Sequence, residues 1–573
     1  MLRPTILLRA FHRHYSSINP QIKPDFAPWA TNWTMSSPGP DSAPNESRKR
    51  PAPSNRQSKN KKQKKADKPA KEGGSEEVLL FDVQDLLKRF SLDNKPPADT
   101  EENAFKLLPQ LYTELELTVH AISSTGDALA LDPSSKHVYV VPYAVPGDKV
   151  TAKVLKHFEK EKYSLTDLVK VEKPSDRRDD SLIRCQYFAS CSGCQFQMLP
   201  YSDQLAHKKS IVVKAYKNFS MLDPQLVPTV ADTIGSPLEY GYRTKLTPHF
   251  DGPPGGRRDR RNNKKPSWTE VPPIGFMKKG TRKTIDIEDC PIGTDAVRMG
   301  MKSERARVTK HIDTYSRGAT ILLRESTERI SKSKYEEKES TDTIFEDRGD
   351  YVHAKTCITD QTAISTEFID DFTFQNPAGA FFQNNNSILP TFTNYVRQHI
   401  LPPKSSGHKI LNLIDAYSGS GLFTISLASL FQKSVGIDIS SSSIAFASKN
   451  AKLNNLPEEQ ASFMAADARD LFKSVEFDAS ETVVVIDPPR KGCDDNFLKQ
   501  LLKFGPERVV YVSCNVHTQA RDVGMLVRGM IGVEGTYEIE SLVGFDFFPQ
   551  TSHVEGVAVL NKKVVKTEME TGE

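Results

Sequence analysis

Five short apolar runs alternate with amphipathic stretches between Ile410 and Ser513. The runs are rich in Val, Ile and Ala and occupy residues 410–416, 434–437, 461–465, 482–486 and 508–513. Their length and composition predict strands that are buried on both faces. The stretches 422–431 and 440–453 have helical spacing, and serines at the start of the second can cap it. Repeated strand–helix units predict an α/β fold with a parallel, doubly wound sheet, in which ligands bind beyond the carboxyl ends of the strands.

A second pattern, in residues 110–175, predicts a small β-barrel. Short strand-like runs at 119–122, 128–131, 137–141 and 148–154 are separated by Gly and Pro turns. Basic side chains follow on the expected rim: Lys153, Lys156, His157, Lys160 and Lys162. A basic rim on a small barrel suits the backbone of a nucleic acid, although a structural barrel with a soluble edge would show the same charges.

The length and composition indicate a multidomain chain with polar tails. At 573 residues it should hold two or three domains, and its hydrophobic content of 37% indicates that polar segments dilute an ordinary core. The net charge is only +4, but the basic residues are clustered. Seven irregularly spaced cysteines do not form the framework of a secreted disulfide protein. No run of about 18 apolar residues occurs, so no membrane span is expected.

The first 78 residues carry two candidate targeting signals. Residues 1–20 contain arginines and leucines and no acid, which is typical of a mitochondrial transit segment, and we expect that segment to span residues 1–34. Residues 35–78 form a basic tail that we expect to be disordered, and its two basic clusters resemble a bipartite nuclear signal or a non-specific RNA-binding run. Translation from Met1 or from Met35 would give a mitochondrial or a nuclear form. Residues 79–109 are expected to be a linker or helical segment, and residues 563–573 a disordered tail.

A cysteine cluster marks the predicted central α+β domain, residues 176–375. Cys185, Cys191 and Cys194 lie close together in the sequence, and Cys290 lies far from them. Three close thiols with a remote fourth can hold a [4Fe-4S] cluster or a zinc ion, and the spacing does not decide between them or exclude chance buried cysteines. The Gly-, Pro- and Arg-rich insertion 251–268 predicts a surface loop that contacts RNA.

Polar residues follow the strands of the predicted catalytic domain, residues 376–562. A GxG turn at 419–421 follows the first strand, and Asp438 ends the second, where it can bind a ribose hydroxyl. This arrangement fits either a dinucleotide or S-adenosylmethionine. Asp487 is followed by two prolines that stiffen its loop, which favours a methyltransferase. Helix capping is the structural alternative for both aspartates.

Cys514 ends the fifth strand, and Glu555 lies in a later apolar strand. Carbon 5 of uracil is a poor nucleophile, and addition of a thiolate at carbon 6 would activate it. We expect backbone amides at a strand-to-helix turn to lower the pKa of Cys514, and burial to raise that of Glu555 so that it serves as a general base. An amino-group methyltransferase with the same Asp-Pro-Pro loop would not need the thiol. Cys357 and Cys493 lack this context and are expected to be structural.

With these residues in hand, the chain resembles the RNA 5-methyluridine (uracil-5) methyltransferase family over residues 110–562, and most resembles its fungal-type tRNA members. GAFFQN resembles the family's FxQ cofactor segment, which implies Gln383. DAYSGSG resembles its first cofactor motif, which implies Tyr417, although bacterial relatives often have Cys and Asn there. Asp438 and Asp487 match the remaining cofactor positions. Cys514 in VSCN matches the nucleophile and Glu555 in PQTSHVEGV the base. Cys185, Cys191, Cys194 and Cys290 match the iron–sulfur ligands of some members.

The resemblance implies a class I S-adenosylmethionine methyltransferase fold preceded by a barrel that resembles the TRAM domain. It also implies S-adenosyl-L-methionine as cofactor and the T-loop uridine of tRNA as target. Ribosomal RNA as the substrate, or an RNA-folding helper whose methylation is incidental, are the alternatives. We expect a monomer, located in the nucleus, the mitochondrion or both, with the cytoplasm as a further location.

Overall fold

The computed structural model describes residues 71–563 apart from 94–107, 133–135, 254–267, 337–339, 404–406, 408, 467–471 and 473–474. All of these residues belong to one structural unit, residues 69–573. The predicted transit segment, the basic tail and most of the 251–268 insertion lie outside the described residues. The location in the nucleus or mitochondrion therefore stays a prediction, as do the domain boundaries and the monomeric state.

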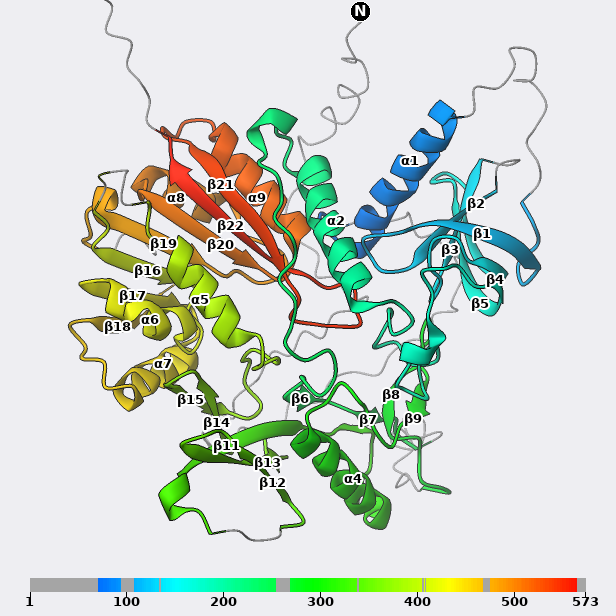
Figure 1. The fold of residues 1–573 in the computed structure, drawn as a ribbon, viewed down its shortest axis with the longest axis horizontal. Coiled ribbons are helices and arrows are strands. Elements are labelled where there is room, and N and C mark those ends of the chain that lie inside the picture. Colours follow the sequence, from blue (N-terminus) through cyan, green and yellow to red (C-terminus); the bar gives the residue numbers. More distant parts are fainter. Residues whose placement is uncertain are drawn as a thin grey trace, which may run out of the picture. The chain divides into compact units, whose positions relative to one another are not determined.

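A seven-stranded sheet forms the carboxyl-terminal part of the chain, as Figure 1 shows. Its strands, in spatial order, are β18 (Ala461–Ala465), β17 (Lys433–Asp438), β16 (Asn412–Ala416), β19 (Thr482–Ile486), β20 (Arg508–Ser513), β22 (Glu555–Lys562) and β21 (Tyr537–Phe545). The first five are parallel to one another, β22 runs antiparallel to them, and β21 pairs with β22 in antiparallel register. The five strands predicted from the apolar runs are thus confirmed.

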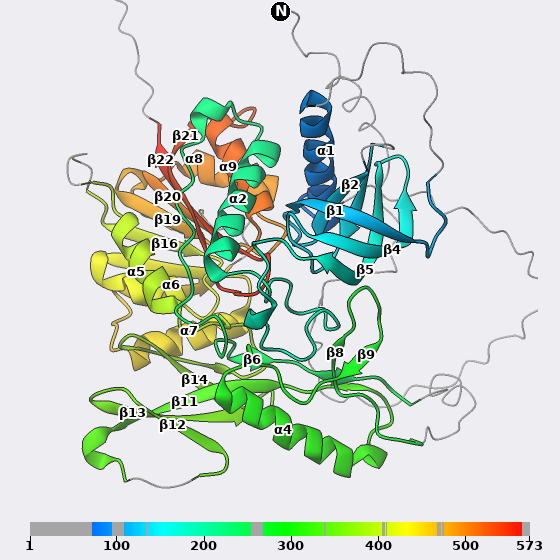
Figure 2. The ribbon, with the colours of Figure 1, turned by 45° about the vertical axis from the view of Figure 1, so that its right-hand side comes forward.

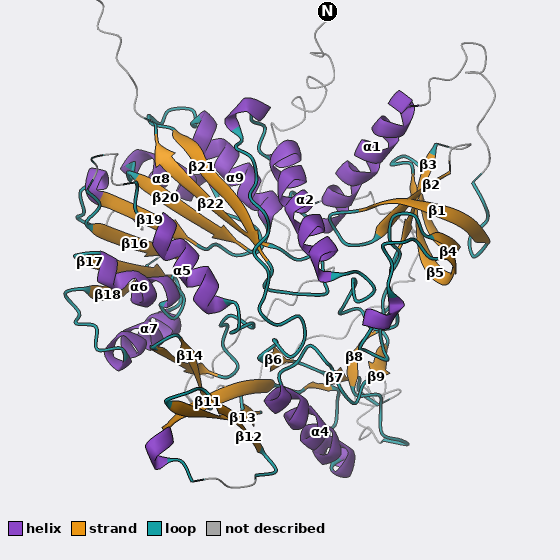
Figure 3. Ribbon diagram, viewed as in Figure 1, coloured by secondary structure: helices purple, strands orange, loops and turns teal. Residues whose placement is uncertain are grey.

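Helices cover both faces of this sheet, which explains why its central strands are apolar throughout. They are α5 (Leu389–His399), α6 (Leu422–Leu427), α7 (Ser441–Leu453), α8 (Asp495–Phe504) and α9 (Val516–Arg528) (Figure 3). Ser440 caps α7 as expected, because its hydroxyl accepts from the backbone N–H of Ser443. Asn515 caps α9 by accepting from the N–H of His517, so the residue after Cys514 fixes the start of a helix.

The predicted barrel is present and closed, with strand order β1-β2-β3-β5-β4. Its strands are β1 (Glu114–Ile122), β2 (Ala128–Asp132), β3 (His137–Val141), β4 (Lys149–Phe158) and β5 (Tyr163–Lys173). The sequence predicts four or five short strands here without giving a range for β5, and Lys153, Lys156 and His157 lie on β4 rather than on a rim that follows it. Helix α1 (Ser75–Asp93) packs Leu79, Val83 and Leu86 against this barrel, so the segment expected to be a linker or a helix begins as a helix.

The region between barrel and catalytic sheet contains helices α2 (Tyr201–Phe219) and α4 (Asp295–Lys310) and three small sheets. One sheet has the order β10-β7-β8-β9: β10 (Ala319–Thr320), β7 (His249–Phe250), β8 (Gly275–Met277) and β9 (Thr284–Asp286). The second has the order β12-β13-β11-β6: β12 (Thr343–Asp347), β13 (Tyr351–Ile358), β11 (Leu323–Ser331) and β6 (Lys245–Leu246). The third is the hairpin of β14 (Ile364–Ile369) and β15 (Phe372–Pro377).

Helix α2 joins this central region to the catalytic sheet. It packs along α9 and β21, and Figure 2 shows it beside α9 after rotation of the view. Its buried residues Ile211, Val212 and Ala215 belong to the same apolar cluster as the helices on that face of the sheet. Among the described residues, no helix combines the length and apolar composition that crossing a membrane requires.

Candidate functional site

The sheet places three predicted site residues at neighbouring strand ends. Asp487 directly follows β19, Cys514 directly follows β20, and Glu555 is the first residue of β22. Strands β20 and β22 pair in antiparallel register with Ser513 opposite Gly556, which puts Cys514 next to Glu555. The structure therefore brings the predicted nucleophile, the predicted base and the Asp-Pro-Pro loop together.

The thiol lies in an acidic environment. Burial, and after it the carboxylates of Glu555 and Asp487, raise the pKa of Cys514 to about 12, while the guanidinium of Arg490 opposes them. The lowered thiol pKa that we expected from the turn geometry is therefore wrong, because desolvation and two carboxylates outweigh the one cation. Cys514 nevertheless remains partly accessible to solvent.

Both carboxylates are shifted in the direction that a base near neutral pH requires. Burial raises the pKa of Glu555 well above its usual value, with Asp487 adding to the shift and Arg490 opposing it. Burial and the carboxylate of Asp415 raise the pKa of Asp487 to about 7. The raised pKa expected for Glu555 is thus found, with the expected cause.

Asp415, in the DAYSGSG motif, belongs to the same acidic group and was missed from the sequence. It is fully buried in β16 and accepts from the backbone N–H of Thr424 at 2.9 Å and from its hydroxyl at 2.7 Å. Burial, with Asp438 adding to it, raises its pKa to about 7. Its second oxygen has no hydrogen-bond partner among the described residues. Its place in the Gly-rich motif was the available signal.

The cofactor positions implied by the resemblance lie in different environments. Asp438 ends β17 and accepts from the N–H of Gly419 at 3.1 Å, so it lies against the Gly-rich turn as expected. Tyr417 has a positive φ of 65° and packs its ring against Phe497, 5.3 Å away, so its side chain lies in the core rather than beside Asp438. Any cofactor contact at that position would come from its backbone. Gln383 lies half-buried, in a loop after β15.

Arg490 is a further site residue that the sequence reading left without a role. It follows the two prolines, and its guanidinium opposes the rise in the pKa of the Cys514 thiol. The carbonyl of Arg490 accepts from the Asn515 amide at 2.9 Å and from the Thr518 hydroxyl at 3.3 Å. The loop after Asp487 is therefore held by the first turn of α9, next to the thiol.

The four cysteines of the predicted metal centre are near neighbours. Burial raises the pKa of Cys290, and the thiols of Cys194, Cys191 and Cys185 add to the shift. In the described part of the chain, however, no group of three or more His, Cys, Asp or Glu residues is arranged to hold a metal ion. The predicted iron–sulfur or zinc centre is therefore not supported by the described residues.

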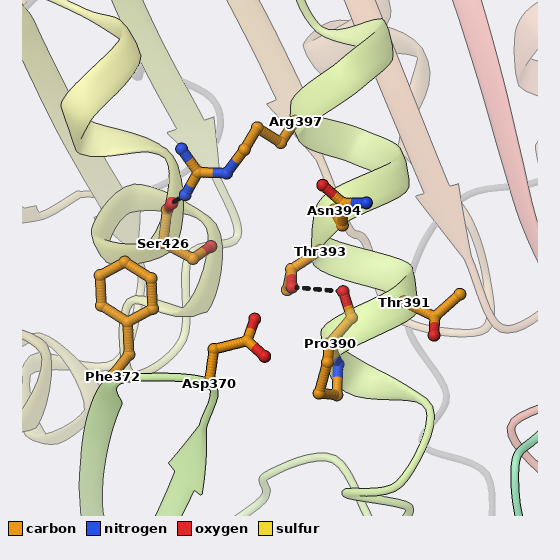
Figure 4. A pocket seen from close by; sticks show the side chains of 8 residues that line it. All are labelled: Asp370, Phe372, Pro390, Thr391, Thr393, Asn394, Arg397 and Ser426. Carbon is orange, nitrogen blue, oxygen red and sulfur yellow. Dashed lines mark hydrogen bonds between the residues drawn. The ribbon is translucent and has the colours of Figure 1, made fainter.

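One pocket lies away from these strand ends (Figure 4). It is lined by Asp370, Phe372, Pro390, Thr391, Thr393, Asn394, Arg397 and Ser426. The guanidinium of Arg397 donates to the carbonyl of Ser426 and, at 3.1 Å, to the hydroxyl of Ser429, so these groups already satisfy one another. None of the predicted site residues lines it.

Comparison with known proteins gives independent evidence on the family of the chain. A family model described as tRNA (Uracil-5-)-methyltransferase matches residues 355–563. The chain is 42% identical to a tRNA (uracil(54)-C(5))-methyltransferase of Schizosaccharomyces pombe, over 89% of this chain and 88% of the relative. It is 39% identical to the enzyme of the same name from Saccharomyces cerevisiae, over 85% of this chain and 81% of the relative.

A solved structure with a similar fold is that of a Pyrococcus abyssi tRNA (uracil-54, C5)-methyltransferase in complex with S-adenosyl-L-homocysteine. It covers 78% of this chain and all of that chain with a TM-score of 0.53 at 22% identity. This likeness and the strand order confirm the predicted fold class. Because two fungal relatives match along most of its length, the chain belongs to the tRNA (uracil-5-)-methyltransferase family.

Proposed function

We propose that this enzyme transfers a methyl group from S-adenosyl-L-methionine to carbon 5 of the T-loop uridine of tRNA, uridine 54. The observation that carries the proposal is the adjacency of Cys514 and Glu555 at the ends of paired strands β20 and β22. The names of the two fungal relatives support the tRNA substrate and the position. An amino-group methyltransferase has no use for this thiol–carboxylate pair.

The two residues divide the chemistry between them. The Cys514 sulfur bonds to carbon 6 of the ring, and the electron pair of the C5–C6 double bond moves toward oxygen 4 to give an enolate. Carbon 5 would then take the methyl group, as the methyl–sulfur bond of S-adenosyl-L-methionine breaks and S-adenosyl-L-homocysteine leaves. Glu555 removes the proton from carbon 5, the C5–C6 double bond forms again, and the thiolate leaves. Flipping the uridine out of the RNA costs a few kcal/mol of lost base stacking, which contacts between the enzyme and the RNA must offset.

The acidic group around the thiol fits a cationic cofactor. Asp415, Asp487 and Glu555 all have raised pKa values, because burial desolvates them and neighbouring carboxylates add to the shift. S-adenosyl-L-methionine, when bound, supplies an electrophilic methyl group on a positively charged sulfur. A positive charge here favours the ionised form of both carboxyl and thiol groups. Asp438 and the Gly-rich turn would hold its nucleoside, and Gln383 lies on the loop that the resemblance assigns to the cofactor.

Replacing Asp438 with Ala should weaken binding of S-adenosyl-L-methionine by roughly 10- to 100-fold, the scale of hydrogen bonds to a charged group. Isothermal titration calorimetry would measure the change. The matched control is Lys433→Ala at the opposite, amino-terminal end of the same strand, where the exposed side chain should not affect affinity. Equal affinities of the Asp438 variant and the wild type would remove this residue from the cofactor site.

The hairpin tip between β8 and β9 provides a basic surface for the RNA backbone. Residues 278–283, KKGTRK, contain four cations and no acid, and Lys278, Arg282 and Lys283 are exposed. Lys279 instead pairs with Asp127 of the barrel at 2.9 Å, which fixes the tip to the barrel. Backbone hydrogen bonds of 3.0 Å from Ser192 to Met277 and from Lys279 to Ser190 anchor it further. Three exposed cations on a fixed hairpin suit phosphate contacts.

Reversing these charges in Lys278→Glu/Arg282→Glu/Lys283→Glu should raise the KM for tRNA by about tenfold or more and leave kcat unchanged, because phosphate contacts mainly set affinity. The dependence of KM on salt should also become shallower by about 2–3 units in the log–log slope. Steady-state kinetics at several salt concentrations would test both.

The matched control reverses the charge of three exposed cations of the catalytic domain. They lie at the start of β17 and in the last turns of α7 and α8: Lys433, Lys452 and Lys503. This variant has the same net charge change and should keep the wild-type KM and salt slope. Equal effects of the two triple variants would indicate a general charge effect rather than a binding surface.

The proposed function is tested by incubating the purified enzyme with S-adenosyl-L-methionine and an unmodified tRNA transcript, followed by nucleoside mass spectrometry and mapping of the modified position. The expected product is 5-methyluridine at uridine 54. A methyl group on an exocyclic amine, or activity on ribosomal RNA alone, would contradict the proposal. The control is a transcript in which cytidine replaces the target uridine, and it should gain no 5-methyluridine at that position.

A further inference from the structure

The loop between β21 and β22, residues 546–554, is organised around one buried lysine. Lys208 of α2 is fully buried, and its ammonium donates to a carboxylate oxygen of Asp546, to the carbonyl of Phe548 at 3.0 Å and to the carbonyl of His553 at 2.8 Å. All three acceptors belong to this loop, near its beginning and its end. Glu555 is the second residue after the last of them.

Among the described residues, the hydrogen bonds of the Lys208 ammonium all go to acceptors of the 546–554 loop. An ammonium has three N–H donors, and the three loop acceptors use all of them. Asp546 is fully buried as well, and its bonded oxygen also accepts from the N–H of Phe548 at 3.1 Å. A buried cation tolerates such a place only when it is paired and fully hydrogen-bonded. The loop can therefore close correctly only around the intact ammonium.

A second set of contacts holds the middle of the loop. Gln550 has a φ of 70°, a left-handed conformation that residues other than glycine seldom adopt. Its backbone N–H donates to the side chain of Gln204 at 3.0 Å, and its carbonyl accepts from the N–H of Gln195 at 2.7 Å. Tyr242 donates to the carbonyl of Pro549 at 3.0 Å. Such backbone strain persists only where the surroundings fix it, and here α2 and its neighbours do so.

We propose that Lys208 is a positioning residue for Glu555: by holding the 546–554 loop it sets the carboxylate against carbon 5, so that proton removal, and with it release of Cys514, depends on it. This inference rests on the proposed function. It predicts a defect in the second half of the reaction only. The first half, bonding of the Cys514 sulfur to carbon 6, needs Cys514 and Arg490 on other loops.

Two variants test the proposal. Lys208→Met removes the ammonium but leaves Asp546 buried and unpaired, so it can lose the fold. Lys208→Met/Asp546→Asn removes both charges and keeps the loop without its central cation. The matched control is Lys209→Met, the next residue of α2, whose ammonium pairs with the exposed Asp232 at 2.8 Å. Circular dichroism and thermal unfolding establish that each variant is folded before its kinetics are compared.

In the double variant we expect turnover of tRNA to fall by at least about tenfold, since small misplacements of a catalytic group cost up to ~100-fold. The covalent protein–RNA complex should accumulate on denaturing gels during turnover. The rate of adduct formation with transcript containing 5-fluorouridine should stay within twofold of wild type, because carbon 5 of that base carries no proton to remove. Lys209→Met should match wild type in all three measurements.

Two outcomes would overturn the inference. One is a folded double variant that turns over within twofold of wild type. The other is a parallel fall of turnover and fluorouridine trapping, which would indicate a general structural role. If instead wild-type enzyme and Cys514→Ala give the same result with fluorouridine transcript, the proposed mechanism fails and Lys208 has no base to position. The failures of the two proposals are thus distinguishable.

Discussion

Replacing Cys514 with Ala is expected to abolish methylation, with a fall in kcat on the order of 10⁴-fold or more, the scale seen when the nucleophile of a covalent mechanism is lost. Without sulfur addition at carbon 6, carbon 5 of uracil lacks the electron density to accept a methyl group. The same variant should form no covalent adduct with transcript containing 5-fluorouridine. Filter binding should show that it still binds tRNA, since Cys514 contributes little contact area.

The matched control is Cys357→Ala. Cys357 lies in β13 of the central region, half-buried, and is not adjacent to the strand ends that carry the site. This variant should methylate tRNA and trap fluorouridine at the wild-type rate. Methylation by Cys514→Ala within tenfold of wild type would exclude the covalent route and leave an amino-group or direct transfer mechanism to be considered.

The catalytic sheet was predictable because its signals are local. Each parallel strand is a short apolar run, and in a parallel sheet all such runs end at one edge, so Asp487 and Cys514 could be placed together from their positions after successive runs. Glu555 could be added from its place in an apolar strand. The antiparallel pairing of β20 with β22, which makes it the neighbour of Cys514, is a matter of register that the sequence does not state.

The electrostatics of the site were not predictable in the same way. The sign of the Cys514 shift depends on how closely two carboxylates and one guanidinium approach the thiol, and on how much water is excluded. Asp415 shows the same difficulty, because its raised pKa comes from burial inside the sheet. Local turn chemistry argued for a thiolate, and tertiary neighbours reversed the direction.

Contacts between residues far apart in the sequence could not be predicted either, because they leave no local pattern of polar and apolar residues. Lys208 and Asp546 are 338 residues apart, and nothing in the helical periodicity of α2 distinguishes a lysine that will be buried from a half-buried one such as Lys209. The metal centre predicted from the cysteine cluster is unsupported for a related reason. Spacing in the sequence suggested a metal centre, but ligands must converge within coordination distance, and the described residues provide no such group.

Glu555→Gln should separate the two halves of the reaction. Glutamine keeps the shape of the side chain but cannot take the proton from carbon 5, so turnover should fall by about 10²- to 10⁴-fold, the usual contribution of a general base. Sulfur addition and methyl transfer precede this step and should continue. The variant should therefore accumulate a protein–RNA complex whose uridine already carries the methyl group, detectable on denaturing gels and by mass spectrometry. Rapid turnover without such a complex would assign the proton to another base, with Asp487 the nearest candidate.

The pH dependence provides an independent check with a defined sign. A base works only when deprotonated, and burial raises the pKa of Glu555 well above its usual value. The thiol of Cys514, raised to about 12, must also lose its proton. At pH 6 both Glu555 and Cys514 favour the protonated, inactive form. For wild type, kcat/KM should therefore rise as pH increases from 6 to about 9. In Glu555→Gln the contribution of the carboxylate is absent, so the remaining rise in the rate of adduct formation should follow the thiol alone. A wild-type rate that stays constant across this range would mean that neither group is protonated there, which is incompatible with burial raising both pKa values.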